Sequence, residues 1–355
     1  MKKLKRDNQR REQRREQRRV LVYERMDPTD KSLKWLEDKG VAVTRGRAMW
    51  EAPFFRYTEK EIVATARDYP AVMGASGAAF PRRVIEALPQ LRFISKFGVG
   101  FDNIDIDFAT RRGVLVSITP EASEIADVAE HTIATMLALK KNLQHWTPEY
   151  LQHGGWRPGR FAGSLAGCTV GLIGLGYIGS AVARRLVGWD VTVLAHDPAS
   201  PLPAHDVILT GLDTLLRTSD IVSLHANPTA RNHHLIDAAA FKQMKPSAIL
   251  LNTARASLVD TQALIHALQH KIIAGCALDV YEVEPPLAND PLFRLPNVLV
   301  TPHTAAWTRA GLENLGWHAA RNLWAMMSGE GDADLVNPAA TTNGPTARAM
   351  GSVLR

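Results

Sequence analysis

One stretch constrains the fold of this chain more than any other: an apolar run at 169–173 that leads into a glycine-rich turn and then a helical pattern. Its glycines stand at Gly174, Gly176 and Gly179. Gly174 permits a tight turn after a strand, Gly176 lets the backbone approach a pyrophosphate, and Gly179 lets a helix at 180–187 pack against the sheet. The spacing predicts a dinucleotide-binding strand, turn and helix, and the alternative is the same unit with incidental glycines.

A second strand pattern supports the cofactor interpretation. It runs over 191–196 and ends at Asp197, 18 residues beyond Gly179. A carboxylate at this place accepts hydrogen bonds from ribose hydroxyls and repels the 2′-phosphate of NADP. We therefore expect the cofactor to be NAD.

The positive charge of the chain is concentrated at its N-terminus. The 355 residues carry a net charge of +6, whereas residues 1–19 alone carry +7 and have almost nothing apolar to bury. This composition predicts a disordered basic arm at 1–19. No aromatic or fold motif accompanies the arm, so we do not expect nucleic acid as a partner. The sequence shows no secretory signal and no apolar run that could span a bilayer, so we expect a cytoplasmic protein without a membrane partner.

Short apolar strands alternate with helical patterns twice along the chain. This order predicts an α/β fold with two doubly wound Rossmann-like domains built on parallel sheets. A helical pattern at 309–327 follows the second set of strands and is expected to cross back to the first lobe. The cofactor domain is thus inserted in the substrate (catalytic) domain. The predicted parts are a substrate domain at 20–118 and 308–338, an NAD-binding domain at 119–307 and a disordered tail at 339–355.

Two segments at the start of the second domain have contrasting patterns. Apolar residues recur at helical spacing from Ser123 to about Leu143, which predicts a long helix. Proline and glycine are frequent after it, and they predict a loop-rich connector.

Ligands of doubly wound sheets bind at the carboxyl ends of the strands, so polar residues directly after strand patterns are candidates for chemistry. Arg255, Glu284 and His303 each follow such a pattern. An arginine can bind a carboxylate with two parallel donors, and an imidazole can exchange protons near neutral pH.

The residues around these positions resemble the NAD-dependent D-2-hydroxyacid dehydrogenases, a family that includes D-3-phosphoglycerate and glyoxylate/hydroxypyruvate enzymes. The resemblance covers nearly all of 20–338 and is carried by several stretches in a fixed order. They are residues 98–103, 169–179, 219–225, 252–255, 277–286 and 301–303.

The resemblance implies hydride transfer between NAD(H) and a small D-2-hydroxy acid or 2-keto acid. Arg255 would bind the substrate carboxylate, His303 would be the general acid or base, and Glu284 would orient and stabilise the imidazole. In the first domain the implied substrate-binding residues are Lys96, Gly98, Val99 and Gly100. Phosphoglycerate enzymes carry arginines where this chain has Ala75 and Lys96, which argues against a phosphorylated substrate.

The resemblance also implies a set of cofactor-binding residues and no metal. Asp279 would accept from the nicotinamide carboxamide, and Tyr177 and Ile178 would lie over the pyrophosphate. The full set is Gly174, Gly176, Tyr177, Ile178, Gly179, Asp197, Thr253, Ala254, Arg255, Asp279 and His303.

Two further expectations concern partners. The long apolar helix after Ser123 and the dimers usual in the resembling family predict a homodimer. An alternative function is that of a dehydrogenase-like, NAD-sensing corepressor, because such partner-binding proteins share several of the same stretches, including the one that contains His303.

Overall fold

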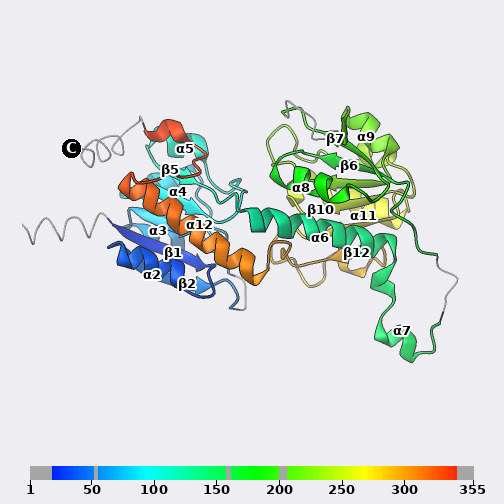
Figure 1. The fold of residues 1–355 in the computed structure, drawn as a ribbon, viewed down its shortest axis with the longest axis horizontal. Helices are drawn as coiled ribbons and strands as arrows, with labels where there is room; N and C mark the ends of the chain where they lie inside the picture. Colours follow the sequence, from blue (N-terminus) through cyan, green and yellow to red (C-terminus); the bar gives the residue numbers. More distant parts are fainter. Residues whose placement is uncertain (1–17, 52–54, 157–160, 200–205, 342–355) are drawn as a thin grey trace, which may run out of the picture. The chain divides into compact units, whose positions relative to one another are not determined.

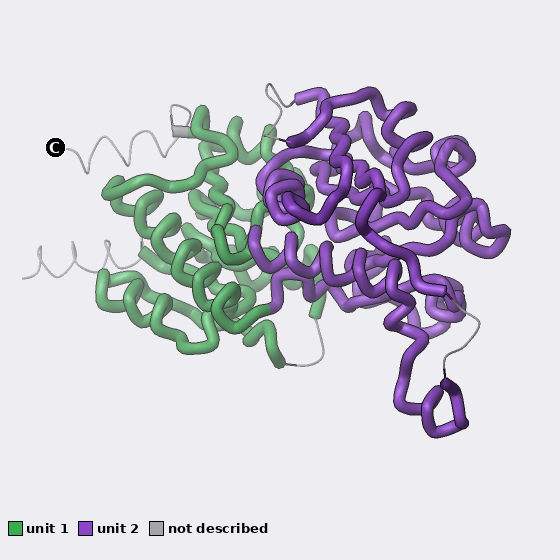
Figure 2. Tube along the Cα trace, turned by 45° about the vertical axis from the view of Figure 1, so that its right-hand side comes forward, with its two compact units in different colours: residues 1–124, 308–355 green, residues 125–307 purple. Residues whose placement is uncertain are grey.

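The computed structural model describes residues 18–51, 55–156, 161–199 and 206–341. The chain forms two compact units (Figure 2), residues 1–124 with 308–355, and residues 125–307. Each unit is built on one wholly parallel sheet, with five strands in the first and seven in the second (Figure 1). The predicted α/β class with two parallel-sheet domains is confirmed.

The first unit has the strand order β2-β1-β3-β4-β5. Its strands are β1 (Arg19–Arg25), β2 (Ala42–Ala48), β3 (Ala71–Gly74), β4 (Phe93–Lys96) and β5 (Leu115–Ser117). Its helices are α2 (Lys31–Asp38), α3 (Glu59–Ala66), α4 (Arg82–Ala87), α5 (Ile106–Arg111) and α12 (Arg309–Ser328).

Helices cover both faces of this sheet because the buried strand residues alternate between two cores. On β1, Val20 and Val22 pack with residues of α2 and α12, whereas Leu21 and Tyr23 pack with residues of α3, α4 and α5. A strand with both faces buried reads as a continuous apolar run, as β1 does. Helix α12, expected to cross back to the first lobe, contributes residues to this core.

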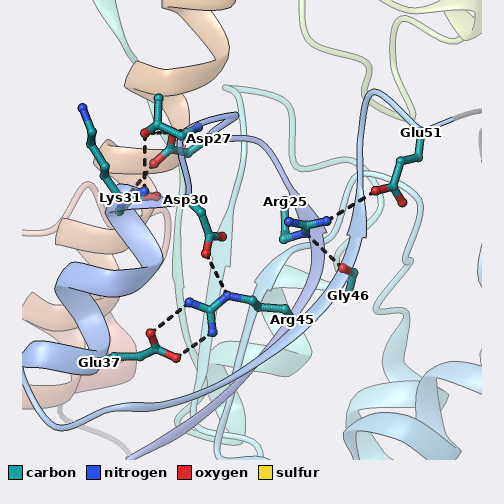
Figure 3. Close-up of polar contacts among 10 residues, drawn as sticks. Arg25, Asp27, Asp30, Lys31, Glu37, Arg45, Gly46 and Glu51 are labelled. Carbon is teal, nitrogen blue, oxygen red and sulfur yellow. Dashed lines mark hydrogen bonds and ion pairs between the residues drawn. The ribbon is translucent and has the colours of Figure 1, made fainter.

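Helix α2 is also tied to the sheet by polar contacts (Figure 3). Arg45 of β2 donates to Asp30 at 3.0 Å and makes two hydrogen bonds to Glu37 at 2.6 and 2.9 Å. The guanidinium lowers the pKa of the Glu37 carboxyl, through the hydrogen bonds first and through charge second. These exposed ion pairs position the helix more than they stabilise the fold.

The second unit has the strand order β12-β11-β10-β9-β6-β7-β8. Its strands are β6 (Thr169–Ile173), β7 (Thr192–His196), β8 (Val207–Leu209), β9 (Ile221–Leu224), β10 (Ile249–Asn252), β11 (Gly275–Leu278) and β12 (Val298–Val300). Its helices are α6 (Ala122–Lys140), whose first residues belong to the other unit, α7 (Pro148–Gln152), α8 (Tyr177–Leu186), α9 (Leu212–Thr218), α10 (Ala238–Gln243) and α11 (Thr261–Gln269).

The strands added after β6 lie on one side of it (β7 and β8), whereas β9 and the later strands lie on the other side. The strand order therefore reverses between β6 and β9, which makes this the topological switch point. One face of the sheet packs against α6 and α8, and the other packs against α9, α10 and α11. The ends of five strands are in register, because Leu224 pairs with both Ile173 and Asn252, and Leu278 pairs with Asn252 and Val300. The loops after these strands therefore leave the sheet from a single edge.

The structure differs from the sequence-based expectations at several boundaries. Helix α8 begins at Tyr177 and not at Ser180, because Gly176 adopts an extended conformation and forms its N-cap. The expected loop-rich connector contains α7, which begins at Pro148 and is capped by Thr147. Proline breaks a helix when it lies in the interior, but it is favoured at the first helical position, where Pro148 lies.

The chain ends differ as well. Arg19, placed in the predicted arm, begins β1, and residues 1–17 lie outside the described residues. Residues 339–341, placed in the predicted tail, belong to the 3-10 turn η4 (Pro338–Thr341), where Ala340 is fully buried. Residues 342–355 lie outside the described residues. Within the described ranges, no helix is long and apolar enough to cross a membrane.

Candidate active site

The glycine turn at the switch point gives each of its three glycines a different role. Gly174 has φ +97°, and a Cβ there would lie 2.6 Å from the amide nitrogen of Ala226. A Cβ on Gly179 would lie 2.1 Å from the carbonyl oxygen of Gly174. Gly176 is different, because a Cβ there would meet nothing within 4 Å. Gly174 and Gly179 are thus needed for the fold of the turn, whereas Gly176 faces open space.

The N-terminus of α8 suits a phosphate group. Its N-cap, Gly176, offers no side-chain cap, and the first turn contains no acidic residue. Uncapped amides at a helix N-terminus attract anions through hydrogen bonding and the helix dipole. Tyr177 and Ile178 lie in this first turn, and the Tyr177 side chain is exposed. The arrangement therefore fits the pyrophosphate of a dinucleotide.

Asp197 follows β7 directly, where the ribose is expected. Its carboxylate accepts from the Leu175 amide at 2.8 Å and from the Ala199 amide at 2.9 Å, one bond to each oxygen. A carboxylate has about four acceptor positions, so both oxygens retain capacity for a hydroxyl. These bonds also attach the carboxylate to the glycine turn.

His225 follows β9 next to the same turn, and its imidazole shares one hydrogen bond with the Ser223 hydroxyl at 2.8 Å. Burial lowers the pKa of His225 to about 4. The ring is therefore neutral at physiological pH. A Cβ on Gly179 would lie 3.5 Å from the Cβ of His225, so this residue borders the glycine turn.

The loop after β10 is shaped by Asn252, a buried residue that the sequence reasoning did not assign to the site. Its side chain accepts from the Ala254 amide at 3.0 Å and donates to the Arg255 carbonyl at 2.9 Å. Thr253 bonds Thr132 of α6 at 3.1 Å between hydroxyls. The three predicted residues Thr253, Ala254 and Arg255 are thus held on one braced turn. The signal in the sequence that could have identified Asn252 was a polar asparagine at the end of an apolar strand pattern.

His303 and Glu284 form a hydrogen-bonded pair. The distance between Nδ1 of His303 and Oε2 of Glu284 is 2.9 Å, and the other carboxylate oxygen accepts from the Tyr281 amide at 3.1 Å. The Glu284 side chain is 18% exposed and that of His303 is 51% exposed. Because Nδ1 is engaged by the carboxylate, Nε2 is the nitrogen available for proton exchange.

The backbone of His303 has φ +55°, in the left-handed region that β-carbon-bearing residues seldom adopt. Strained residues of this kind persist where the surroundings determine them, and they cluster at functional sites. Here Asp279 binds the next two amides, those of Thr304 at 2.8 Å and Ala305 at 3.0 Å.

Asp279 is 2% exposed, and it also accepts from the Thr301 hydroxyl at 2.6 Å. The structure therefore gives this carboxylate a role in holding the His303 loop, which the sequence did not predict. Tyr281 adds to the same loop by donating to the Thr301 carbonyl at 2.8 Å.

In the first unit, Gly98 lies in a turn two residues after β4 and has φ +78°. The Gly98 amide donates to the Thr119 hydroxyl at 2.6 Å, and the Thr119 amide donates back to the Gly98 carbonyl at 3.1 Å. Among the described residues, no acceptor receives a hydrogen bond from the amides of Val99 or Gly100. The turn thus presents two successive amides that suit an anionic oxygen.

Lys96, expected to contact the substrate, lies in the interior of the first unit. It is 6% exposed and donates to the Ala75 carbonyl at 3.3 Å. Glu24 is also buried, and it accepts from the amides of Ser76 and Gly77. Burial raises the pKa of Glu24, while these amides and Lys96 oppose that shift. The ammonium is therefore engaged inside the unit.

Arg255, Glu284 and His303 belong to the loops after β10, β11 and β12, which leave the sheet at the same edge as the glycine turn. A doubly wound sheet with a glycine turn and a strand-end carboxylate at this edge is typical of dinucleotide-binding domains. The family model "D-isomer specific 2-hydroxyacid dehydrogenase, NAD binding domain" matches residues 133–305.

Two curated relatives extend the match beyond that domain. The glyoxylate reductase of Thermofilum pendens is 40% identical over 289 residues, which cover 79% of this chain and 85% of the relative. The D-3-phosphoglycerate dehydrogenase of Archaeoglobus fulgidus is 35% identical over 315 residues, which cover 88% of this chain but 58% of that longer protein. The chain belongs to the D-isomer-specific 2-hydroxyacid dehydrogenase family.

A solved structure agrees with this placement. The NADPH-dependent glyoxylate/hydroxypyruvate reductase of Sinorhizobium meliloti, in complex with NADP and malonate, has a TM-score of 0.76 and 31% identity. The alignment covers 90% of this chain and 97% of that one. The chain is thus an oxidoreductase of 2-hydroxy acids with a nicotinamide cofactor, and the relatives named here are all enzymes, with none pointing to the corepressor alternative.

Proposed function

We propose that the chain reduces a small, unphosphorylated 2-keto acid to the D-2-hydroxy acid with NADH, and catalyses the reverse oxidation. The observation that carries this proposal is the His303–Glu284 pair, with Nδ1 bound to the carboxylate and an exposed imidazole. NADH, when bound, supplies a hydride to the carbonyl carbon. His303 donates the proton to the carbonyl oxygen through Nε2, and it takes that proton back in the oxidation.

Glu284 is proposed to orient the imidazole and to stabilise its charged form. Arg255 is proposed to bind the substrate carboxylate, because a guanidinium offers two parallel donors. The amides of Val99 and Gly100 in the first unit are the second group proposed to bind substrate oxygen. For the cofactor, we propose that Gly174, Gly176, Tyr177, Ile178, Gly179 and Asp197 hold the pyrophosphate and ribose, with Thr253, Ala254 and Asp279 toward the nicotinamide.

The substrate class follows from Lys96. A phosphate group needs available cations, whereas the ammonium of Lys96 is buried beside Glu24 and bound to a carbonyl oxygen. We therefore favour substrates such as glyoxylate or hydroxypyruvate, which carry one carboxylate and no phosphate.

A panel of keto acids tests the proposal. NADH oxidation would be followed with glyoxylate, hydroxypyruvate and phosphohydroxypyruvate. We expect turnover with the first two and a kcat/KM at least about tenfold lower with the third, since one missing charged contact is worth over 1 kcal/mol. Equal or better efficiency with phosphohydroxypyruvate would reject the substrate class, and no turnover with any keto acid would reject the function.

The same proposal includes a homodimer in the cytoplasm. The dimer is supported by large apolar side chains that are exposed near α7, namely Leu143, Leu151, Trp156 and Phe161. Exposed apolar residues gathered in one segment are typical of a protein interface. The location is supported by Cys168 and Cys276, which are both free thiols.

A further inference from the structure

His131 of α6 is the first residue in a series of hydrogen bonds that extends to the His303 loop. Its Nε2 lies 3.1 Å from the hydroxyl oxygen of Thr301, and that hydroxyl lies 2.6 Å from Oδ1 of Asp279. A carboxylate can only accept, so the Thr301 hydroxyl must give its proton to Asp279. The hydroxyl oxygen is then the acceptor for His131, which requires a proton on Nε2 of that ring.

Asp279, the last residue in this series, holds the backbone next to His303. Asp279 binds the amides of Thr304 and Ala305, which follow the positive φ of His303. Its Oδ1 lies 4.0 Å from Nε2 of His131. A buried carboxylate is costly unless its oxygens are satisfied, so each donor contributes to keeping Asp279 in place.

We propose that His131 is a positioning residue for the reaction, acting through Thr301 and Asp279 to hold the His303 loop in its strained conformation. The inference rests on the function proposed above. His131 fixes the rotamer of Thr301, so that the hydroxyl proton points at Asp279 and not elsewhere. Hydrogen bonds in such a series strengthen one another, so the loss of the first weakens the rest.

Three variants test the role. His131→Phe keeps an aromatic ring but removes the donor, and His131→Gln restores an N–H near the position of Nε2. The matched control is Thr135→Val on the same helix, because among the described residues the buried Thr135 hydroxyl bonds only the helix carbonyls of His131 and Thr132. For each variant we would measure kcat, the Kd of NADH by fluorescence and the melting temperature.

We expect His131→Phe to lower kcat roughly 10- to 100-fold, the loss typical of a slightly misplaced reacting group. The Kd of NADH should stay within about twofold of the parent value, because the variant leaves the proposed pyrophosphate and ribose contacts at the glycine turn and Asp197 in place. His131→Gln should recover most of kcat, and Thr135→Val should leave it unchanged. An unchanged kcat in His131→Phe, or equal losses in the Phe and Gln variants, would overturn the proposal.

A readout without turnover separates this inference from the proposed function. The ring resonances of His303 in an NMR spectrum should shift in His131→Phe and return toward the parent positions in His131→Gln. If the parent protein reduces no keto acid, the proposed function fails. If these resonances are the same in all variants, the positioning role fails whatever the substrate.

Discussion

His225 shows how the surroundings of one residue create a dependence on pH. Its imidazole is neutral in the fold because burial lowers its pKa to about 4, whereas the ring of an unfolded chain has a pKa near 6.5. Below pH 6.5 the unfolded chain gains a proton that the folded chain does not. Stability from this group is therefore complete above pH 6.5 and is lost as the pH falls toward 4.

We predict that unfolding by urea at pH 7 and pH 5 will reveal this loss. The parent protein should lose up to about 2 kcal/mol more between the two pH values than His225→Gln, which has no titrating ring. Equal losses in the two proteins would show that the imidazole titrates normally in the fold.

Asp197 decides between cofactors at the residue scale. Asp197→Asn keeps an acceptor for one of the two backbone amides that bind the carboxylate, and it removes the charge that repels a 2′-phosphate. The ratio of kcat/KM for NADPH to that for NADH should rise roughly tenfold or more, as expected for about 1.4 kcal/mol of removed repulsion. A parent enzyme that already uses both cofactors equally would contradict the preference for NAD.

The sequence placed Arg255, Glu284 and His303 on strand-end loops, because strand patterns and motif spacing are local properties. It could not predict the partners of Asp279, since the Asp279 contacts join segments about 25 residues apart through a loop with a positive φ. The burial of Lys96 beside Glu24 was hidden for the same reason, because these residues lie on different strands.

At the scale of elements, two glycines of the turn between β6 and α8 have different roles, one in folding and one in cofactor binding. Gly174→Ala places a Cβ against Ala226 at a φ of +97°, so we predict a clear drop in melting temperature, equivalent to at least about 1 kcal/mol. Gly176→Ala has φ −73° and open space around the new Cβ, so the melting temperature should not change.

The same two variants differ in cofactor binding. The methyl group of Gly176→Ala points into the space proposed for the pyrophosphate, so NADH titration should show weaker binding by a fully folded protein. Parent-like affinity in Gly176→Ala would place the pyrophosphate elsewhere.

Helices with long apolar patterns, such as α6 and α12, were predicted from their periodicity. The sequence reasoning left out α9, α10 and α11, which have between six and nine residues. Short helices carry too few turns for periodicity to be recognised. Asp237 and Asp260 cap two of them through their side chains, and these caps were the local signal available.

At the scale of the whole molecule, the insertion of one unit in the other could be predicted because α12 follows a sheet that is already complete. The homodimer is a prediction, because it depends on a second copy of the chain that covers exposed surface. We expect light scattering at micromolar concentration to give twice the chain mass of 39.0 kDa.

The proposed interface can be tested with the exposed residues near α7. Trp156→Ser combined with Phe161→Ser should shift the mass toward that of the monomer, whereas Trp189→Ser, an exposed tryptophan elsewhere in the second unit, should not. A monomeric parent protein would reject the dimer, and an intact dimer in the double variant would reject this interface.

The central claim is that His303 exchanges the proton of the reaction, and His303→Asn tests it most directly. Asparagine tolerates the left-handed backbone and can donate to Glu284, but it has no titrating nitrogen. We predict that kcat for keto-acid reduction falls roughly 10²- to 10⁴-fold while the Kd of NADH stays within about twofold of the parent value. Near-normal turnover by His303→Asn would contradict the account.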